Sequence, residues 1–158
     1  MIATLLLPAA YVGTSYYMGK RCPMDGAPKS KTAPPGYVFG IVWTILYALL
    51  GYVVARLWYM YGKSSGNNRH VIMAAIVFGV LAFGTSIYWV YIFGCKRKQR
   101  EALYVLLAFV FFVMMHLYLV AKLNLVLGAL TVPLMVWSIF ALLMNHQIVN
   151  DTTTLPAR

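Results

Sequence analysis

Five long apolar runs dominate this 158-residue chain. Each comes close to or exceeds the ~20 residues that a helix needs to cross the hydrocarbon core of a bilayer. A backbone in that environment must satisfy its own hydrogen bonds, so we expect the runs to be helices. Their limits are Ile2–Met18, Gly36–Met60, Val71–Phe93, Ala102–Ala121 and Leu125–Ile148. The sequence therefore predicts an all-α membrane protein: one five-transmembrane-helix bundle over residues 1–150, followed by a polar tail, 151–158.

Composition excludes the main soluble classes. Hydrophobic residues make up 62% of the chain and charged residues 10%, against about 45–50% and about 25% in soluble domains. A globule of this size has too little interior to hide so much apolar surface. A soluble enzyme and a nucleic-acid-binding module are both excluded. The basic residues that give the chain its net charge of +10 lie mostly between the apolar runs. This arrangement is typical of residues that flank a membrane.

The first apolar run also resembles the core of a secretory signal peptide. It has no basic segment before it, because Lys20 and Arg21 follow the run instead, and no small-x-small cleavage site precedes them. A signal peptide has the opposite order of charge and apolar core. We therefore expect this run to be a retained span.

The connections between the runs differ in character. Gly19–Pro35 is the longest and is rich in proline, which predicts an irregular loop. Tyr61–His70 is rich in Gly, Ser and Asn, and Lys96–Arg100 is a short basic run. Lys122–Asn124 is so short that the last two helices must form an antiparallel hairpin. The tail from Asn150 is polar and is expected to fray.

The basic residues are divided unequally between the two sides of the predicted bundle. The first and third connections and the tail hold nine of them: Lys20, Arg21, Lys29, Lys31, Lys96, Arg97, Lys98, Arg100 and Arg158. The opposite side holds four: Arg56, Lys63, Arg69 and Lys122. Since cytoplasmic loops carry the excess of Lys and Arg, the sequence predicts that the nine-residue side, with the C-terminus, is cytoplasmic.

Conventional catalytic chemistry has no candidates here. The acids Asp25, Glu101 and Asp151 all lie outside the apolar runs, so no carboxylate pair is available for acid–base work. Cys22 and Cys95 form no CxxC motif, and the three histidines are scattered. No thiol redox centre and no metal site is indicated. A coupled transporter is also disfavoured, because ionisable residues inside the spans are almost absent.

Polar groups inside the spans are costly and therefore mark candidate sites. His116 lies near the middle of the fourth run. It would either ligate the metal of a bound porphyrin or, as we favour, hydrogen-bond to a neighbouring helix. Asn145 in the fifth run must find an interhelical partner. Ala75, Gly79 and Gly84 give the third run a small-residue face that would suit dimerisation.

Aromatic residues form stripes on three of the predicted helices. Gly40, Trp43 and Tyr47 share one face of the second, where Gly36 and Gly40 would let a neighbouring helix approach closely. This face would line a crevice or belong to ordinary packing or an interfacial aromatic belt. The third helix carries Thr85, Tyr88 and Trp89. The fifth carries Pro133, Trp137, Ala141 and Asn145 on one face, with a kink expected at the proline.

One of these segments resembles a known family. Residues 34–47, PPGYVFGIVWTILY, are similar to the opening of the second helix of the translocator protein family (TspO, the tryptophan-rich sensory proteins or peripheral benzodiazepine receptors). The fifth run, with Pro133, Trp137, Phe140-Ala141 and Asn145, is similar to that family's fifth helix. Tyr88–Gly94 stands where the family has a tryptophan-rich segment. The resemblance covers about residues 1–150.

The resemblance implies a five-helix transmembrane bundle, often homodimeric, in a bacterial membrane or the mitochondrial outer membrane. No cofactor is required. Protoporphyrin IX or haem would be bound as a ligand, as would sterol, lipid or drug-like molecules, in a pocket capped by the first loop. Some bacterial relatives degrade protoporphyrin under light with two tryptophans that match Trp43 and Trp137 here. Lys29 and Lys31 would attract the propionates of a porphyrin.

The ligand site predicted from the stripes and the resemblance has fifteen members. They are Pro34, Pro35, Val38, Phe39, Gly40, Trp43, Tyr47, Thr85, Tyr88, Trp89, Pro133, Trp137, Phe140, Ala141 and Asn145. The chain also departs from the family pattern. Tyr37 and Tyr88 stand where the family usually has tryptophans, and Thr85 stands where it usually has an asparagine. The first loop lacks the family's Trp-Tyr pair. His146 and Asn150 interrupt the sterol-recognition motif, so sterol binding through that motif is unsupported.

Two functions of different class follow from the sequence. The first is an integral membrane protein that binds tetrapyrroles or other apolar ligands for sensing, transport or regulation. The second is a light-dependent enzyme that degrades protoporphyrin IX with Trp43 and Trp137 as catalytic residues. A third, a structural protein that acts through helix contacts, becomes the main interpretation only if no ligand binds.

Overall fold

The computed structural model describes residues 3–24, 26–30 and 32–154, and of residues 3–5, 153 and 154 it describes the backbone only. Five α-helices account for nearly all of the described chain. They are α1 (Ala3–Arg21), α2 (Gly36–Lys63), α3 (Asn67–Val90), α4 (Gln99–Leu123) and α5 (Leu125–Thr154). A short π-helical turn, η1 (Tyr91–Cys95), prolongs α3. The predicted all-α, five-helix fold is confirmed.

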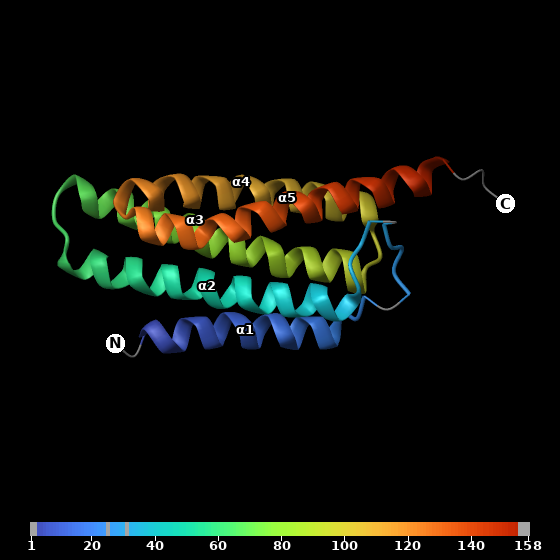
Figure 1. Ribbon diagram of the computed structural model, residues 1–158, viewed down its shortest axis with the longest axis horizontal. Coiled ribbons are helices and arrows are strands. Elements are labelled where there is room, and N and C mark those ends of the chain that lie inside the picture. Colours follow the sequence, from blue (N-terminus) through green and yellow to red (C-terminus); the bar gives the residue numbers. More distant parts are fainter. Residues whose placement is uncertain (1–2, 25, 31, 155–158) are drawn as a thin grey trace.

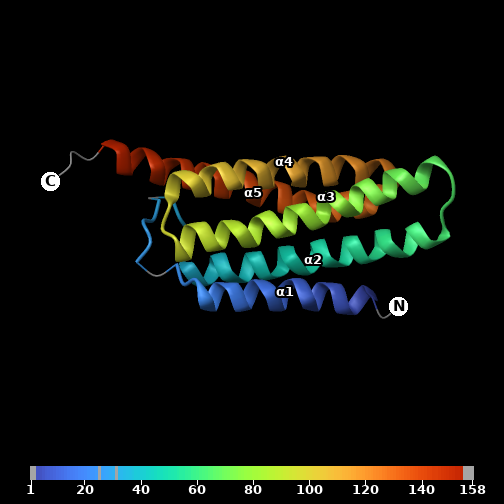
Figure 2. The ribbon, with the colours of Figure 1, turned by 180° about the vertical axis from the view of Figure 1, so that it is seen from behind.

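The helices lie side by side and run alternately in opposite directions (Figure 1; Figure 2 shows the same bundle from behind). α1 packs mainly on α2, and α2 also contacts α3 and α5. α4 packs against both α3 and α5. The first and third connections therefore lie together at one end of the bundle with the end of α5, and the chain begins at the other end.

Four helical segments are long and apolar enough to cross a membrane. Within the described residues they are Gly36–Lys63, Asn67–Cys95, Gln99–Leu123 and Leu125–Thr152. α1 does not reach that hydropathy, because serine, threonine, glycine and tyrosine interrupt its apolar residues. It nevertheless lies alongside α2 at the level of the other helices (Figure 1). The bundle is thus an integral membrane fold to which α1 adds an outer helix.

Most helices extend beyond the apolar runs that predicted them. α2 ends at Lys63 instead of Met60, and α3 begins at Asn67 instead of Val71. The tail expected to fray from Asn150 instead continues α5 to Thr154. Hydropathy marks where side chains leave an apolar environment, whereas backbone hydrogen bonding continues into the polar turns beyond it. As a result the second and third connections shrink to residues 64–66 and 96–98.

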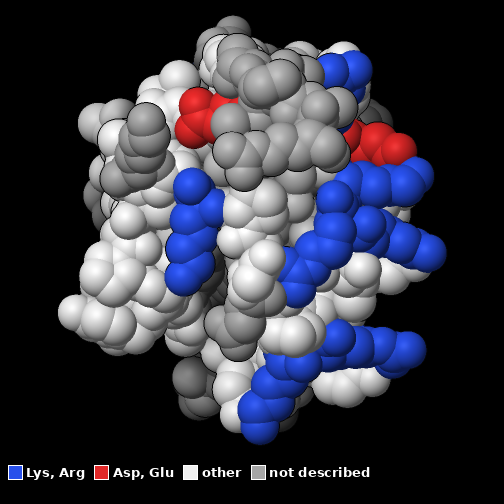
Figure 3. Space-filling model, turned by 90° about the vertical axis from the view of Figure 1, so that its right-hand side faces the viewer, with Lys and Arg blue, Asp and Glu red and all other residues white. Residues whose placement is uncertain are grey.

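Basic side chains cover the end of the bundle at which the first and third connections meet. Figure 3 looks onto this end and shows Lys and Arg over much of it. The exposed basic residues in the two connections and the adjoining helix ends are Lys20, Arg21, Lys29, Lys96, Arg97, Lys98 and Arg100. We call this the basic end.

One glycine of α2 sets the distance to α1. A Cβ atom added at Gly51 would lie 2.7 Å from the Cα of Pro8, so only glycine lets the two backbones pass this closely. Gly36 and Gly40 differ, because a Cβ at either would meet nothing within 4 Å. The prediction that a neighbouring helix packs closely at Gly36 and Gly40 was wrong. Their face borders a cavity.

The small-residue face of α3 is used inside the chain. The Nδ1 atom of His116 in α4 lies 2.7 Å from the carbonyl oxygen of Ala75, which confirms the predicted interhelical hydrogen bond. A Cβ at Gly79 would lie 2.9 Å from the imidazole ring. The sequence had indicated that Ala75 and Gly79 belong to a face free for dimerisation. In the structure they are instead buried against α4. Only Gly84 of that set is exposed.

The close contact at Gly51 predicts a stability difference between two glycines of α2. Gly51→Ala should lower the melting temperature in detergent, since its methyl group meets backbone atoms of Pro8 and such overpacking costs about 1–3 kcal/mol. Gly62→Ala, in the same helix but with nothing within 4 Å of its Cβ, is the matched control and should be neutral. Equal melting temperatures for the two variants would show that α1 does not pack on α2 in this way.

Candidate functional site

A cavity of about 490 Å³ opens at the basic end, between the helices and the first connection. We call the described residues of that connection, 22–24, 26–30 and 32–35, the lid loop. The cavity volume lies within the ~300–1,000 Å³ range of small-molecule sites. The described residues that line it are Ser15, Tyr16, Gly19, Lys20, Met24, Ala27, Pro28, Lys29, Ser30, Ala33, Pro34, Gly36, Phe39, Gly40, Trp43, Thr44, Tyr47, Trp89, Val90, Phe93, Ala141, Met144, Asn145 and Ile148.

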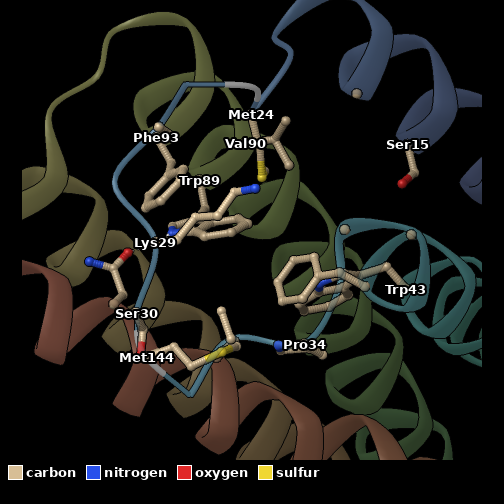
Figure 4. A pocket seen from close by; sticks show the side chains of 18 of the residues that line it. Ser15, Met24, Lys29, Ser30, Pro34, Trp43, Trp89, Val90, Phe93 and Met144 are labelled. Carbon is tan, nitrogen blue, oxygen red and sulfur yellow. Dashed lines mark hydrogen bonds between the residues drawn. The ribbon is translucent and has the colours of Figure 1, made fainter.

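Two aromatic walls face each other across this cavity (Figure 4). On the α2 side, the Trp43 ring stacks on that of Tyr47, with centroids 5.2 Å apart, and Phe39 lies 6.0 Å from Trp43. On the opposite side, Trp89 and Phe93 lie 5.0 Å apart. Trp43, Tyr47, Trp89 and Phe93 are all at most 7% exposed, so the walls are held by the packing of the bundle.

Asn145 fixes one of the two walls. Its Oδ1 accepts a hydrogen bond from the Trp89 indole N–H at 3.1 Å, and its Nδ2 donates to the carbonyl of Gln99 at 3.1 Å. These bonds join α3, α4 and α5, and they confirm the expectation that Asn145 has an interhelical partner. The indole N–H of Trp43 has no hydrogen-bond partner among the described residues. It is thus a buried donor on the wall of the cavity.

The mouth of the cavity is basic. Lys20 at the end of α1 and Lys29 in the lid loop both line it and are both exposed. Among the described lining residues none is acidic. Lys29 was predicted from the sequence, Lys20 was not, and Lys31 lies outside the described residues. The cavity therefore combines an apolar, aromatic interior with a cationic opening.

The lid loop is attached to the bundle on two sides. On the α5 side, the hydroxyls of Ser30 and Thr32 both donate to Gln147 Oε1, the second at 2.9 Å. On the α3 side, Cys22 forms a disulfide with Cys95 in η1. Next to it, Arg97 Nη2 donates to the carbonyl of Pro23 at 3.2 Å. These attachments hold the loop over the mouth.

The sequence did not predict the disulfide. The two cysteines are 73 residues apart and belong to no motif, so no local pattern connects them. Both follow an apolar run that ends on the same side of the bundle, which was the one available signal. Gly94 makes the contact possible, because a Cβ there would lie 2.5 Å from the carbonyl oxygen of Cys22.

Eight of the fifteen predicted site residues line the cavity. They are Pro34, Phe39, Gly40, Trp43, Tyr47, Trp89, Ala141 and Asn145. The other seven, Pro35, Val38, Thr85, Tyr88, Pro133, Trp137 and Phe140, do not. Tyr88 is 52% exposed on the outside of α3. It directly precedes the inward-facing Trp89, and consecutive residues of a helix point in different directions. The Thr85 hydroxyl donates to the Leu81 carbonyl of its own helix at 2.7 Å.

The fifth helix shows the same division between its two ends. Pro133 is exposed and lies two turns before Ala141, so the face on which we placed it does not reach the cavity. Trp137 contacts Phe39, with ring centroids 5.7 Å apart, and of the two only Phe39 lines the cavity. Trp43 and Trp137 therefore do not face the same space, although the resemblance paired them.

Several lining residues were missed by the sequence analysis. Met144 and Ile148 continue the helical stripe of Ala141 and Asn145, and Phe93 lies one turn after Trp89, so the helical repeat would have found all three. The contributions of α1 and of the lid loop carry no such signal. Ser15, Tyr16 and Met24 reach the cavity only because α1 packs on α2 and the disulfide holds the lid.

Comparison with known proteins agrees with this architecture. Residues 2–150 match the TspO/MBR family, which covers all five helices except the last turn of α5. No individual curated protein matches the sequence. The family match, the five-helix membrane bundle and the lid-covered cavity support one conclusion: the chain is an integral membrane protein that belongs to the TspO/MBR family.

Proposed function

We propose that this protein binds a flat, largely apolar molecule with an anionic edge, a tetrapyrrole such as protoporphyrin IX or haem, for sensing, transport or regulation. The observation that carries the proposal is the cavity itself, with opposed aromatic walls inside and two lysines at its mouth. A tetrapyrrole has the complementary distribution: two apolar faces and propionates along one edge.

The aromatic walls would supply most of the affinity. Indole and phenol rings interact with another π-system by offset stacking or edge contacts, and each such pair adds about 0.5–1.5 kcal/mol beyond the burial of area. A macrocycle between Trp43 and Trp89 would contact both walls. The unpaired N–H of Trp43 would donate to an acceptor on the ligand, which relieves the cost of a buried donor left unsatisfied.

The lysines would orient the ligand more than they hold it. Lys20 and Lys29 are exposed, and ion pairs of exposed side chains contribute little, about 0–1 kcal/mol. They nevertheless favour an anionic amphiphile over a sterol, which carries no charge to meet them. The bound ligand would therefore lie with its carboxylates at the basic end and its apolar ring inside the bundle.

We further propose that the mouth faces the cytoplasm. The basic end gathers most of the Lys and Arg of the chain, and short loops with that excess stay on the cytoplasmic side. The ligand would then enter and leave from the cytoplasmic side or the adjoining lipid headgroups.

A tryptophan comparison within α2 tests the binding site. Protoporphyrin IX titrated in the dark should quench the intrinsic fluorescence saturably, and Trp43→Leu should weaken binding about tenfold, the equivalent of ~1.4 kcal/mol. Trp58→Leu is the matched control, because Trp58 lies on the same helix, is 54% exposed and is far from the lid. Equal affinities for the two variants would reject the cavity as the binding site.

Light-driven degradation of the bound porphyrin is a second candidate function. The rings of Trp43, Phe39 and Trp137 form a row that leads away from the cavity, with successive centroids 6.0 and 5.7 Å apart. An excited porphyrin against Trp43 would pass its energy to dioxygen, and the activated dioxygen would add to the macrocycle and open it, with the neighbouring indole taking part. No acid, base or metal is needed for such chemistry, which suits this cavity.

Illumination of the dark-formed complex tests this second function. A protein-dependent product band should appear with the wild type, and Trp43→Phe should suppress it more than Trp137→Phe, since Trp43 lines the cavity and Trp137 does not. Free porphyrin in the same detergent gives the background rate of photobleaching. If the complex bleaches at that background rate, the protein binds its ligand without catalysing its breakdown.

A further inference from the structure

The disulfide between Cys22 and Cys95 lies at the cavity that would hold the ligand. It joins the first residue of the lid loop to the last residue of η1, with Cα atoms 4.7 Å apart. Two cavity-lining residues each lie two positions from one of the cysteines: Met24 on the lid side and Phe93 on the η1 side. The bond therefore ties the lid loop to η1, the segment that carries Phe93 of one aromatic wall.

The two cysteines differ in their access to solvent. Cys22 is fully buried, at 0% exposure, whereas Cys95 is exposed at the basic end. Thiol–disulfide exchange requires that a thiolate reach one sulfur while the other leaves. An external thiol can reach Cys95 only, so the sulfur of Cys22 is the leaving group.

The remaining attachments of the lid are weaker on this side. If the disulfide opens, the hydrogen bond from Arg97 to the Pro23 carbonyl stays at the α3 side, at an exposed position. On the α5 side, Ser30 and Thr32 stay bonded to Gln147. The loop would then be held at its α5 side and at its two ends, where Cys22 N–H still donates to the Met18 carbonyl at 2.8 Å and Pro35 leads into α2, while the residues that follow Cys22 lose their covalent tie to η1. Segments held by few contacts open locally at low free-energy cost.

The basic end is also where a disulfide is open to reduction. Its charge predicts that it faces the cytoplasm, where glutathione and thioredoxin systems keep most cysteines reduced. A cytoplasmic disulfide at a ligand cavity can be opened and closed as the redox state changes. It is therefore better suited to regulate the cavity than to stabilise the fold.

We propose that the Cys22–Cys95 disulfide is a redox latch on the cavity, which slows ligand exchange when closed and permits it when reduced. This inference rests on the proposed function, because it concerns the same cavity. The closed latch holds Met24 and the lid residues that follow against the mouth. Reduction frees this side of the loop, and a ligand stacked between Trp43 and Trp89 can leave past it.

The chemistry is ordinary thiol–disulfide exchange. The thiolate of a small thiol such as glutathione attacks Cys95 Sγ, the S–S bond breaks, and Cys22 leaves as a thiolate that takes up a proton. A second small thiol then attacks the sulfur that the first small thiol contributed to the mixed disulfide. Cys95 leaves as a thiolate and takes up a proton. The protein gains two electrons and two protons, and two small thiols become one disulfide. An oxidised small disulfide drives the reverse sequence.

The test compares dissociation of protoporphyrin IX from oxidised and reduced protein in detergent. The complex is mixed with excess empty micelles in the dark and its fluorescence is followed. Reduction of the wild type with dithiothreitol should raise the dissociation rate about tenfold, because changes at one site act mainly on dissociation. The double variant Cys22→Ser, Cys95→Ser should exchange at the fast rate with or without the reductant, which controls for effects of the reductant itself.

A second readout needs no ligand. A lysine-specific protease can cut the lid loop at the exposed Lys29, and it should do so faster in the reduced wild type and in the double serine variant than in the oxidised protein. If porphyrin does not bind in either state, the proposed function fails while the protease result still decides the latch. Equal protease rates in the oxidised and reduced wild type would overturn the latch, as would equal dissociation rates or a failure of the cysteines to pair.

Discussion

The hydrogen bonds of Asn145 hold three helices to one another at the wall of the cavity. Asn145 is only 1% exposed, and a buried side-chain amide must find its hydrogen-bond partners in the protein. Asn145 finds them in the Trp89 indole and the Gln99 carbonyl, which places α3, α4 and α5 around one point and fixes the plane of Trp89. Across the cavity, the Trp43 indole N–H has no partner in the part of the chain that the structure describes. The Trp89 indole thus has its hydrogen bond within the fold, whereas the Trp43 indole has the free donor that the proposed ligand site uses.

The basic end combines membrane topology with access to the cavity. The charges that favour a cytoplasmic location for this end include Lys20 and Lys29 at the mouth, so the proposed orientation and the proposed preference for an anionic ligand rest on the same residues. The lid loop connects both features to α3 and α5, through Cys22 and through Ser30 and Thr32. The disulfide of Cys22 with Cys95 thus makes one attachment of the loop covalent, which is the basis of the redox latch that we propose.

The fold could be predicted from the sequence because apolar length and backbone hydrogen bonding dictate helices, and the cavity could be predicted in part. The stripe of Gly40, Trp43 and Tyr47 faces it, as do Ala141 and Asn145, because residues one turn apart share a face. Tyr88 and Pro133 do not line it, since the rotation and depth of each helix depend on its neighbours and not on its own pattern. The disulfide was missed for a related reason: only the folded bundle brings residues 73 positions apart into contact.

Indole ¹H–¹⁵N NMR of the detergent-solubilised protein, with and without protoporphyrin IX in the dark, would test the central claim most directly. The chain has four tryptophans, and each gives one N–H signal whose position responds to the ring current of a nearby macrocycle. Our account predicts large shifts for Trp43 and Trp89, a smaller shift for Trp137, which contacts Phe39 but does not line the cavity, and none for Trp58 at the far end of α2. A shift of Trp58 as large as those of Trp43 and Trp89 would show that the porphyrin binds the outer surface of the bundle instead of the lid-covered cavity.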